Sequence, residues 1–247
     1  TTSDYDLSIF KSENKSNKFL KSSNKKLNLR YGENPHQKSY LIQNKGIDLM
    51  KQVIQGKKLS YNNILDIDSA YNCISEFKEP TCAIFKHNNP CGVSSNKNLN
   101  VAYNQAKNSD LISSFGGIIV FNKKVDESLA KVISTNFYEI VMAPDFTLKA
   151  KNIFKTKKLI LLMTKKFNKK KNLDLRLVNQ GYLFQSKNSI IVNRKNIKLV
   201  SNKKASKKEL DDLIFAFKVS KHVKSNAIVL AKNKTTLGIG AGQMSRI

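Results

Sequence analysis

Short apolar runs alternate with segments of helical periodicity along this chain of 247 residues, and the alternation restricts the folds open to it. The apolar runs have the length of buried strands and are found at 82–85, 117–121, 139–143 and 159–163. The segments with helical spacing lie at 64–78, 99–109, 126–135 and 146–154. Such alternation is typical of layered α/β proteins, in which helices cover a mostly parallel sheet. We therefore predict an α/β fold with a largely parallel sheet.

A second group of elements follows a polar, lysine-rich break at 186–206. Ser206 and Glu209 form the S-x-x-E pattern of a capping box, and the apolar residues after them repeat at helical spacing. This pattern predicts a helix that begins at Ser206. Two strands are predicted before the break, at 174–178 and 181–185, and one after the helix, at 226–231.

Composition divides the chain into three regions. Residues 1–26 are rich in Ser, Asn and Lys, apart from a short helical pattern, DYDLSIFK, and are predicted to be a linker that follows an upstream domain. We predict that the polar break at 186–206 divides one α/β unit from the start of a second. The chain begins without Met and its final residues, GAGQMSRI, stop inside a motif, so we expect a fragment of a longer protein.

The formal net charge of +26 points at first to a nucleic acid partner. However, only four of the 44 basic residues are arginine, the residue preferred for bidentate contacts with phosphates and bases. Lys, Asn, Ile and Phe all have AT-rich codons, so a bias in base composition explains the lysine excess without a functional cause. Solvated lysine faces are the simpler interpretation, and a lysine-rich nucleic-acid-binding module is the alternative hypothesis.

The three cysteines, Cys73, Cys82 and Cys91, form no CxxC pair, which argues against a disulfide framework and a structural zinc site. His87 and Cys91 resemble part of the zinc-deaminase signature. That signature needs H-x-E and P-C-x-x-C, and Ser94 stands where its second cysteine would be. We therefore predict no zinc. We also predict no membrane span, because no apolar run approaches about 20 residues.

Polar loops after the predicted strands are the candidate site, because open α/β sheets bind ligands where their strands end. Lys86 and His87 begin the loop KHNNPCG, where they could supply a cation for a developing oxyanion and a base near neutral pH. A solvated lysine beside a capping histidine is the simpler alternative. The glycines of GIGAG at 238–242 depart from the dinucleotide spacing, so a tight turn is the simpler interpretation there. Arg30 is a candidate for binding phosphate or carboxylate.

Six motifs occur in the order that one known family shows. They are RYGENPHQ, GKKLSYNNILDIDSA, KHNNPCGV, SSFGGIIVFN, EIVMAPDF, and VKSNAIV followed by GIGAGQMSR. In this order they resemble the AICAR transformylase region of bifunctional purine biosynthesis proteins, in which a formyltransferase is fused to an IMP cyclohydrolase. The resemblance covers about Leu27 to Ile247, and DYDLSIF resembles the last helix of the cyclohydrolase domain.

The resemblance implies a cytidine-deaminase-like, layered α/β/α fold with two subdomains and without zinc. The first subdomain would span 27–200, and the second would start at 205 and be truncated at 247. The resemblance also implies a homodimer, and the unpaired cysteines favour a cytoplasmic location. It implies transfer of a formyl group from the cosubstrate 10-formyltetrahydrofolate to the 5-amino group of AICAR, which gives FAICAR. The parent chain would also be an IMP cyclohydrolase. The AICAR amine is conjugated into its ring and is a poor nucleophile, so its formylation needs a base and an oxyanion stabiliser.

Matching the motifs residue by residue assigns roles as expectations. His87 would be the base, and Lys86 would stabilise the transition state or protonate the leaving folate nitrogen. The AICAR site would be lined by Arg30 at the phosphate, Tyr31, Gly116, Glu139, Asn226 and Arg246. Glu139 departs from those members that have aspartate there, and Ile247 would contact the folate. A deaminase of related fold is a third hypothesis, which a zinc assay would exclude.

Overall fold

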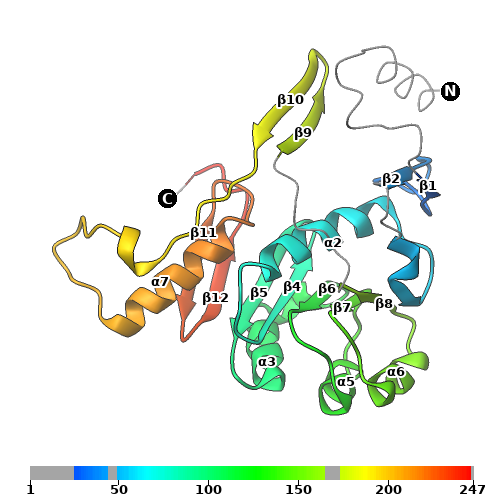
Figure 1. Cartoon of the computed structure of the whole chain (residues 1–247), viewed down its shortest axis with the longest axis horizontal. Coiled ribbons are helices and arrows are strands. Elements are labelled where there is room, and N and C mark those ends of the chain that lie inside the picture. Colours follow the sequence, from blue (N-terminus) through cyan, green and yellow to red (C-terminus); the bar gives the residue numbers. More distant parts are fainter. Residues whose placement is uncertain (1–24, 44–48, 165–172, 246–247) are drawn as a thin grey trace. The chain divides into compact units, whose positions relative to one another are not determined.

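The computed structural model describes most of the chain, namely residues 25–43, 49–164 and 173–245 (Figure 1). The short helix predicted near the N-terminus lies outside them. The chain forms two compact units. Of the described residues, the first unit contains those up to Lys51 together with Lys58–Tyr61, and the second contains Gln52–Lys57 and those from Asn62 onward. The predicted subdomain boundaries stay a prediction.

The first unit contains a small antiparallel strand pair. Its elements are β1 (Lys25–Asn28), β2 (Tyr40–Gln43) and the 3-10 helix η1 (Leu49–Lys51). The backbone N–H of Gly32 donates to the carbonyl oxygen of Gln37 at 2.7 Å and closes the loop between the strands. This loop carries the RYGENPHQ motif.

The second unit is built on an eight-stranded sheet in the order β11-β12-β5-β4-β6-β7-β8-β3. Its strands are β3 (Val53–Gln55), β4 (Thr81–Lys86), β5 (Asn89–Ser95), β6 (Ile118–Phe121), β7 (Ile140–Ala143), β8 (Ile160–Met163), β11 (Ile228–Lys232) and β12 (Thr235–Gly240). Within the described residues only the β6–β7 and β7–β8 pairs are parallel. The prediction of a largely parallel sheet is therefore wrong, whereas the α/β class is confirmed.

Tight turns form two of the antiparallel pairs. His87 and Asn88 have φ angles of 51° and 62°, and Asn233 and Lys234 have 54° and 55°. Two successive residues with positive φ between antiparallel strands form a type I′ turn, which reverses the chain at once. The turns join β4 to β5 and β11 to β12. Neither contains the glycine that usually signals such a turn, so the sequence did not reveal the β4–β5 hairpin.

The prediction of a loop over 86–92 is therefore wrong, since only His87 and Asn88 connect the two strands. β5 begins at Asn89 and includes Pro90. The register between β4 and β5 shifts between Ile84 and Phe85, which is a bulge of the kind that accommodates proline in a sheet.

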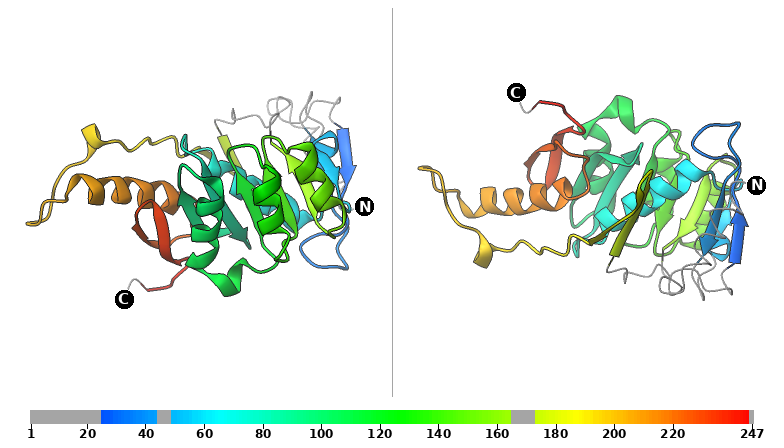
Figure 2. Two further views of the ribbon diagram at one scale, coloured as in Figure 1. Left: turned by 90° about the horizontal axis from the view of Figure 1, so that it is seen from below. Right: turned by 90° about the horizontal axis from the view of Figure 1, so that it is seen from above.

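Helices cover both faces of the sheet, as the two views of Figure 2 show. They are α2 (Tyr61–Ile74), α3 (Leu99–Ser109), α4 (Leu111–Ser114), α5 (Glu127–Ile133), α6 (Leu148–Lys155) and α7 (Lys207–Ser220). α3, α5 and α6 lie on one face, and α2 crosses the opposite face. The predicted layers are thus confirmed. In the described ranges, no helix has both the length and the apolar character needed to cross a membrane.

The predicted capping box at the start of α7 is confirmed. The Ser206 side chain accepts the backbone N–H of Glu209 at 3.2 Å, and the Glu209 carboxylate accepts that of Ser206 at 2.7 Å. The predicted strand pair before this helix is also confirmed, as the antiparallel hairpin of β9 (Leu173–Val178) and β10 (Gly181–Ser186). A 3-10 helix, η2 (Arg194–Asn196), lies between the hairpin and α7.

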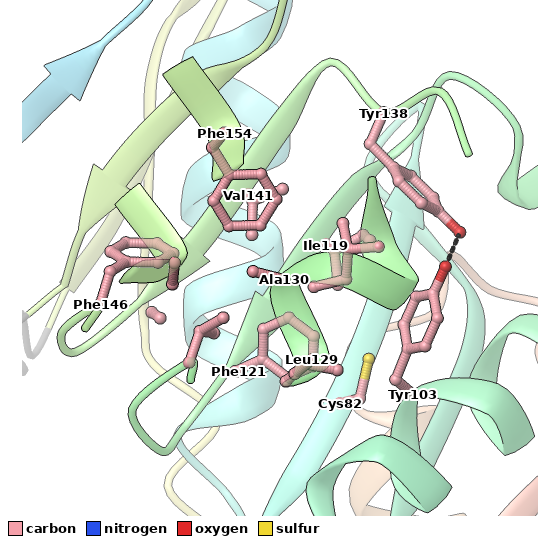
Figure 3. Close-up of a cluster of buried hydrophobic side chains, with 14 of the residues drawn as sticks. Cys82, Tyr103, Ile119, Phe121, Leu129, Ala130, Tyr138, Val141, Phe146 and Phe154 are labelled. Carbon is pink, nitrogen blue, oxygen red and sulfur yellow. Dashed lines mark hydrogen bonds between the residues drawn. The ribbon is translucent and has the colours of Figure 1, made fainter. Parts of the chain in front are cut away.

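The core fills the space between the sheet and the layer of α3, α5 and α6 (Figure 3). Phe146 and Phe154 pack edge to face, with ring centroids 6.2 Å apart. The hydroxyl groups of Tyr103 and Tyr138 are both buried and lie 3.1 Å apart, within hydrogen-bonding distance of each other. The strand ends of this packed sheet give a rigid support for the turn between β4 and β5.

Candidate functional site at the β4–β5 turn

The type I′ turn places His87 at the tip of a hairpin. Lys86 pairs with Asn89 across the hairpin, so His87 and Asn88 alone form the loop. The side-chain amide of Asn89 donates to the carbonyl oxygen of His87 at 3.0 Å. Four residues of β4, from Cys82 to Phe85, are fully buried, whereas His87 is exposed. A rigid strand thus ends in an accessible imidazole.

A cavity of about 440 Å³ opens beside this turn. Lys86 and His87 line it together with the first residues of β5. The opposite walls come from the junction of α3 and α4 and from Gly238 and Ile239 of β12. The two residues predicted to be catalytic therefore lie at one cavity, and three separate parts of the chain enclose it.

Lys86 is held within this cavity by a defined contact. Its Nζ donates to the carbonyl oxygen of Phe115 at 3.0 Å. Asp110, which also lines the cavity, caps α4 by accepting the N–H of Ser113. Burial raises the pKa of Asp110, but hydrogen bonds from Ser113 and Ile112 and the nearby charge of Lys86 outweigh it and lower the pKa. The cavity therefore combines a cation with an ionised carboxylate at neutral pH.

The cysteines offer neither a nucleophile nor a metal site. Cys91 lines the cavity, but burial raises its pKa to about 12, so its thiol is protonated at neutral pH. Cys73 and Cys82 are fully buried. No group of three or more His, Cys, Asp or Glu side chains in the described part of the chain is placed to hold a metal ion.

Gly116 and Glu139 lie on neighbouring backbone beside Lys86. Gly116 directly follows Phe115, whose carbonyl oxygen Lys86 contacts, and has a φ of 74°, which favours glycine. Its N–H donates to the carbonyl oxygen of Phe137 at 3.0 Å, and the N–H of Glu139 donates to that of Gly117 at 3.0 Å. The Glu139 carboxylate also lies 3.5 Å from Lys57 Nζ. The structure thus brings both predicted residues to the end of the sheet that carries Lys86.

Asn226 is linked to the turn through Asn89. The side-chain oxygen of Asn89 accepts the backbone N–H of Lys224 at 3.0 Å, two residues before Asn226. The Asn226 amide donates to the carbonyl oxygen of Gln243 at 2.9 Å. In the glycine motif, residues up to Gly240 belong to β12, and only Gly242 has a positive φ, of 63°. A strand, rather than the predicted tight turn, therefore carries the first two glycines.

Asp66 is a residue of this site that sequence reasoning missed. Its carboxylate accepts the backbone N–H of Asn88 at 2.7 Å. Burial raises the pKa of Asp66, and the Asn88 N–H and the charge of His87 act in the opposite direction. The signal was its position on the face of α2 that also carries the buried residues Asn63, Ile67 and Ala70. A carboxylate within such a stripe indicates a specific partner.

Arg30 and Tyr31 belong to the first unit. One Nη of Arg30 donates to the Tyr31 hydroxyl at 3.5 Å, and the guanidinium lies 5.0 Å from the centroid of the Tyr31 ring. The pair therefore presents a stacked, oriented guanidinium. Arg246 and Ile247 lie outside the described residues, so their predicted roles stay predictions.

Comparisons with a family model and with individual known proteins point to the same family. The model of the AICARFT/IMPCHase bienzyme family matches residues 1–247. The chain is 50% identical over 227 residues to the bifunctional purine biosynthesis protein PurH of Caldicellulosiruptor bescii, covering 89% of this chain and 44% of that protein. It is 48% identical to the protein of the same name from Buchnera aphidicola, and the match covers 94% of this chain and 45% of that protein. It is 44% identical to that of Aquifex aeolicus, and the match covers 89% of this chain and 44% of that protein. The chain thus spans less than half the length of these relatives.

Proposed function

The chain belongs to the AICARFT/IMPCHase bienzyme family, and from this premise we propose that it forms part of an enzyme that transfers a formyl group from 10-formyltetrahydrofolate to the 5-amino group of AICAR. The observation that carries this proposal is the placement of Lys86 and His87 at one cavity by a two-residue turn. The alternative of a nucleic-acid-binding module finds no support in the relatives.

In the proposed reaction, a bond forms between the AICAR amine nitrogen and the formyl carbon, and the bond from that carbon to the folate nitrogen breaks. His87 takes the proton that the amine loses. Lys86 stabilises the negative charge that develops on the formyl oxygen, or gives a proton to the leaving nitrogen. Each role suits the residue, because a cation beside a developing oxyanion and a base at the amine both act on the transition state.

The other predicted residues would bind and orient the substrates. Arg30 and Tyr31 are proposed to contact the nucleotide, with Arg30 at its phosphate. Gly116, Glu139 and Asn226 are proposed to contact AICAR, as is Arg246, while Ile247 contacts the folate. The neighbouring positions of Lys86, Gly116 and Glu139 support this assignment.

Assembly and location also belong to this proposal. We infer a cytoplasmic homodimer. The β9–β10 hairpin supports self-association, because Leu177 and Leu183 are 65% and 58% exposed, and apolar side chains exposed in this way suit a protein interface. Size-exclusion chromatography with light scattering measures the assembly, and a monomer at working concentration would contradict it.

The direct test is turnover by the native protein. With AICAR and 10-formyltetrahydrofolate together, we expect FAICAR and tetrahydrofolate to form in equal amounts, and neither substrate alone should react. A filter-binding titration with RNA tests the alternative, since a nucleic-acid-binding protein loses affinity steeply as salt rises. Salt-sensitive RNA binding without formyl transfer would contradict the proposed function.

Replacing Arg30 by lysine is expected to raise the KM for AICAR by about tenfold, because lysine keeps the charge but loses the forked, charge-assisted contact with phosphate. The KM for the folate should change less. Steady-state kinetics measures both constants. Arg194→Lys is a matched control, because Arg194 forms an ion pair with Asp211 on α7. An AICAR KM that does not change in Arg30→Lys would make Arg30 a structural residue.

A further inference from the structure

The His87–Asn88 turn adopts a backbone conformation that needs support from outside the hairpin. Both residues have positive φ, which is unfavourable for a residue with a Cβ atom, although asparagine tolerates it best. A hairpin with Asn-Gly at these positions would hold this shape by itself. Here histidine occupies the first position, so the turn is intrinsically less stable than an Asn-Gly turn.

α2 supplies support from one side. The Asp66 carboxylate accepts the backbone N–H of Asn88 at 2.7 Å, the short distance expected of a bond to a charged acceptor. With its nitrogen toward α2, the Asn88 side-chain amide also donates to Asp66 at 3.3 Å and to the carbonyl oxygen of Leu65 at 3.2 Å. One carboxylate therefore receives both the backbone and the side chain of the second turn residue.

β5 supplies support from the other side. The Asn89 amide donates to the carbonyl oxygen of His87 at 3.0 Å, and its oxygen accepts the N–H of Lys224 at 3.0 Å. Thus α2 fixes the N–H of Asn88, and β5 fixes the carbonyl oxygen of His87. Removing either contact would leave the direction of the His87 imidazole less constrained.

We propose that Asp66 is a positioning residue for formyl transfer: it holds the His87–Asn88 turn so that the imidazole of His87 lies at the cavity beside Lys86. This inference rests on the proposed function. Asp66 acts through the turn, whereas the proton passes to His87. Burial raises the pKa of the Asp66 carboxyl, and the Asn88 N–H opposes that rise, as expected if the contact stabilises the ionised form.

Kinetics of the native protein tests the role of Asp66. In Asp66→Ala we expect kcat to fall by about 10²-fold, the cost of a catalytic group misplaced by about 1 Å, with little change in either KM. Asp66→Asn keeps an oxygen that can accept the Asn88 N–H and should restore most of kcat. Asp68→Ala is the matched control, because Asp68 lies on the same helix, is exposed and contacts Asn72. Equal kcat in folded Asp66→Ala and Asp68→Ala would overturn the proposal.

Hydrogen exchange separates this inference from the proposed function. The Asn88 amide should exchange at least about tenfold faster in Asp66→Ala than in the wild type, since a bond to a charged acceptor of this kind is lost. Asp66→Asn should restore the protection. This measurement does not depend on turnover. If the wild type were inactive, the proposed formyl transfer would be refuted, and the exchange rate of the Asn88 amide would still test whether Asp66 holds the turn. Unchanged exchange at Asn88, or fast exchange with normal kcat, would overturn the role of Asp66.

Discussion

Replacing His87 by alanine should lower kcat by about 10²- to 10⁴-fold, which is the usual contribution of a positioned general base. AICAR binding should weaken much less, because the proton moves only in the transition state. His87 is exposed at the tip of its hairpin, so the change removes little packing. Steady-state kinetics on the folded variant measures the effect. A kcat close to that of the wild type would remove His87 from the mechanism.

The double variant, compared with the two single variants, shows whether Lys86 and His87 act together. Lys86→Ala should also lower kcat, because its charge acts on the oxyanion of the transition state. If the two residues serve one transition state, the double variant should be less impaired than the product of the single effects. A capping histidine beside a solvated lysine would instead give small, additive changes in stability with kcat nearly constant. Circular dichroism on all three variants confirms that they are folded.

Replacing Gly92 by alanine should destabilise the protein by about 3 kcal/mol, the upper end of the cost of overpacking. A Cβ atom at Gly92 would overlap the carbonyl oxygen of Ala106 in α3, and that backbone atom cannot turn away as a flexible side chain could. For a domain of this size, the change should lower Tm by roughly 6–12 °C. Thermal denaturation followed by circular dichroism measures it.

Gly238→Ala is the matched control for this substitution. A Cβ atom at Gly238 meets nothing within 4 Å, and no positive φ is needed there. Its effect on the free energy of unfolding should stay near 0.5 kcal/mol, as is usual for open positions, roughly a sixth of that at Gly92. Equal stability of the two variants would show that α3 can move away from β5.

The elements that were predicted correctly are those with a local signal. α3 was predicted at 99–109 and occupies Leu99–Ser109, because apolar spacing and a polar N-cap belong to the segment itself. The β4–β5 hairpin was missed, because the His87–Asn88 turn lacks glycine and is held in part by Asp66 on α2. Contacts made by residues distant in sequence leave no local pattern.

The candidate site shows the same limit. Lys86 and His87 could be identified because they directly follow a buried strand and match a known motif. Asp66 had only the signal of a carboxylate on the buried face of its helix, and its partner, a backbone N–H located 22 residues away along the chain, could not be predicted. The predicted boundary between 27–200 and 205–247 depends on a polar break and on the family resemblance. In the structure, β12 from the later region pairs with β5 in one sheet.

The pairing of β12 with β5 has a consequence for synthesis of the protein. Ser94 and Thr235, which meet where the two strands pair, are 141 residues apart in the chain. At translation rates of about 5–20 residues per second, the ribosome takes roughly 7–28 s to add the second strand after the first. Throughout that interval the β4–β5 hairpin can form while β5 stays an open sheet edge, able to pair with other nascent chains. Completion of the cavity wall that contains Gly238 and Ile239 is therefore a late event on the ribosome, and chaperones that cover open edges should matter most in that period.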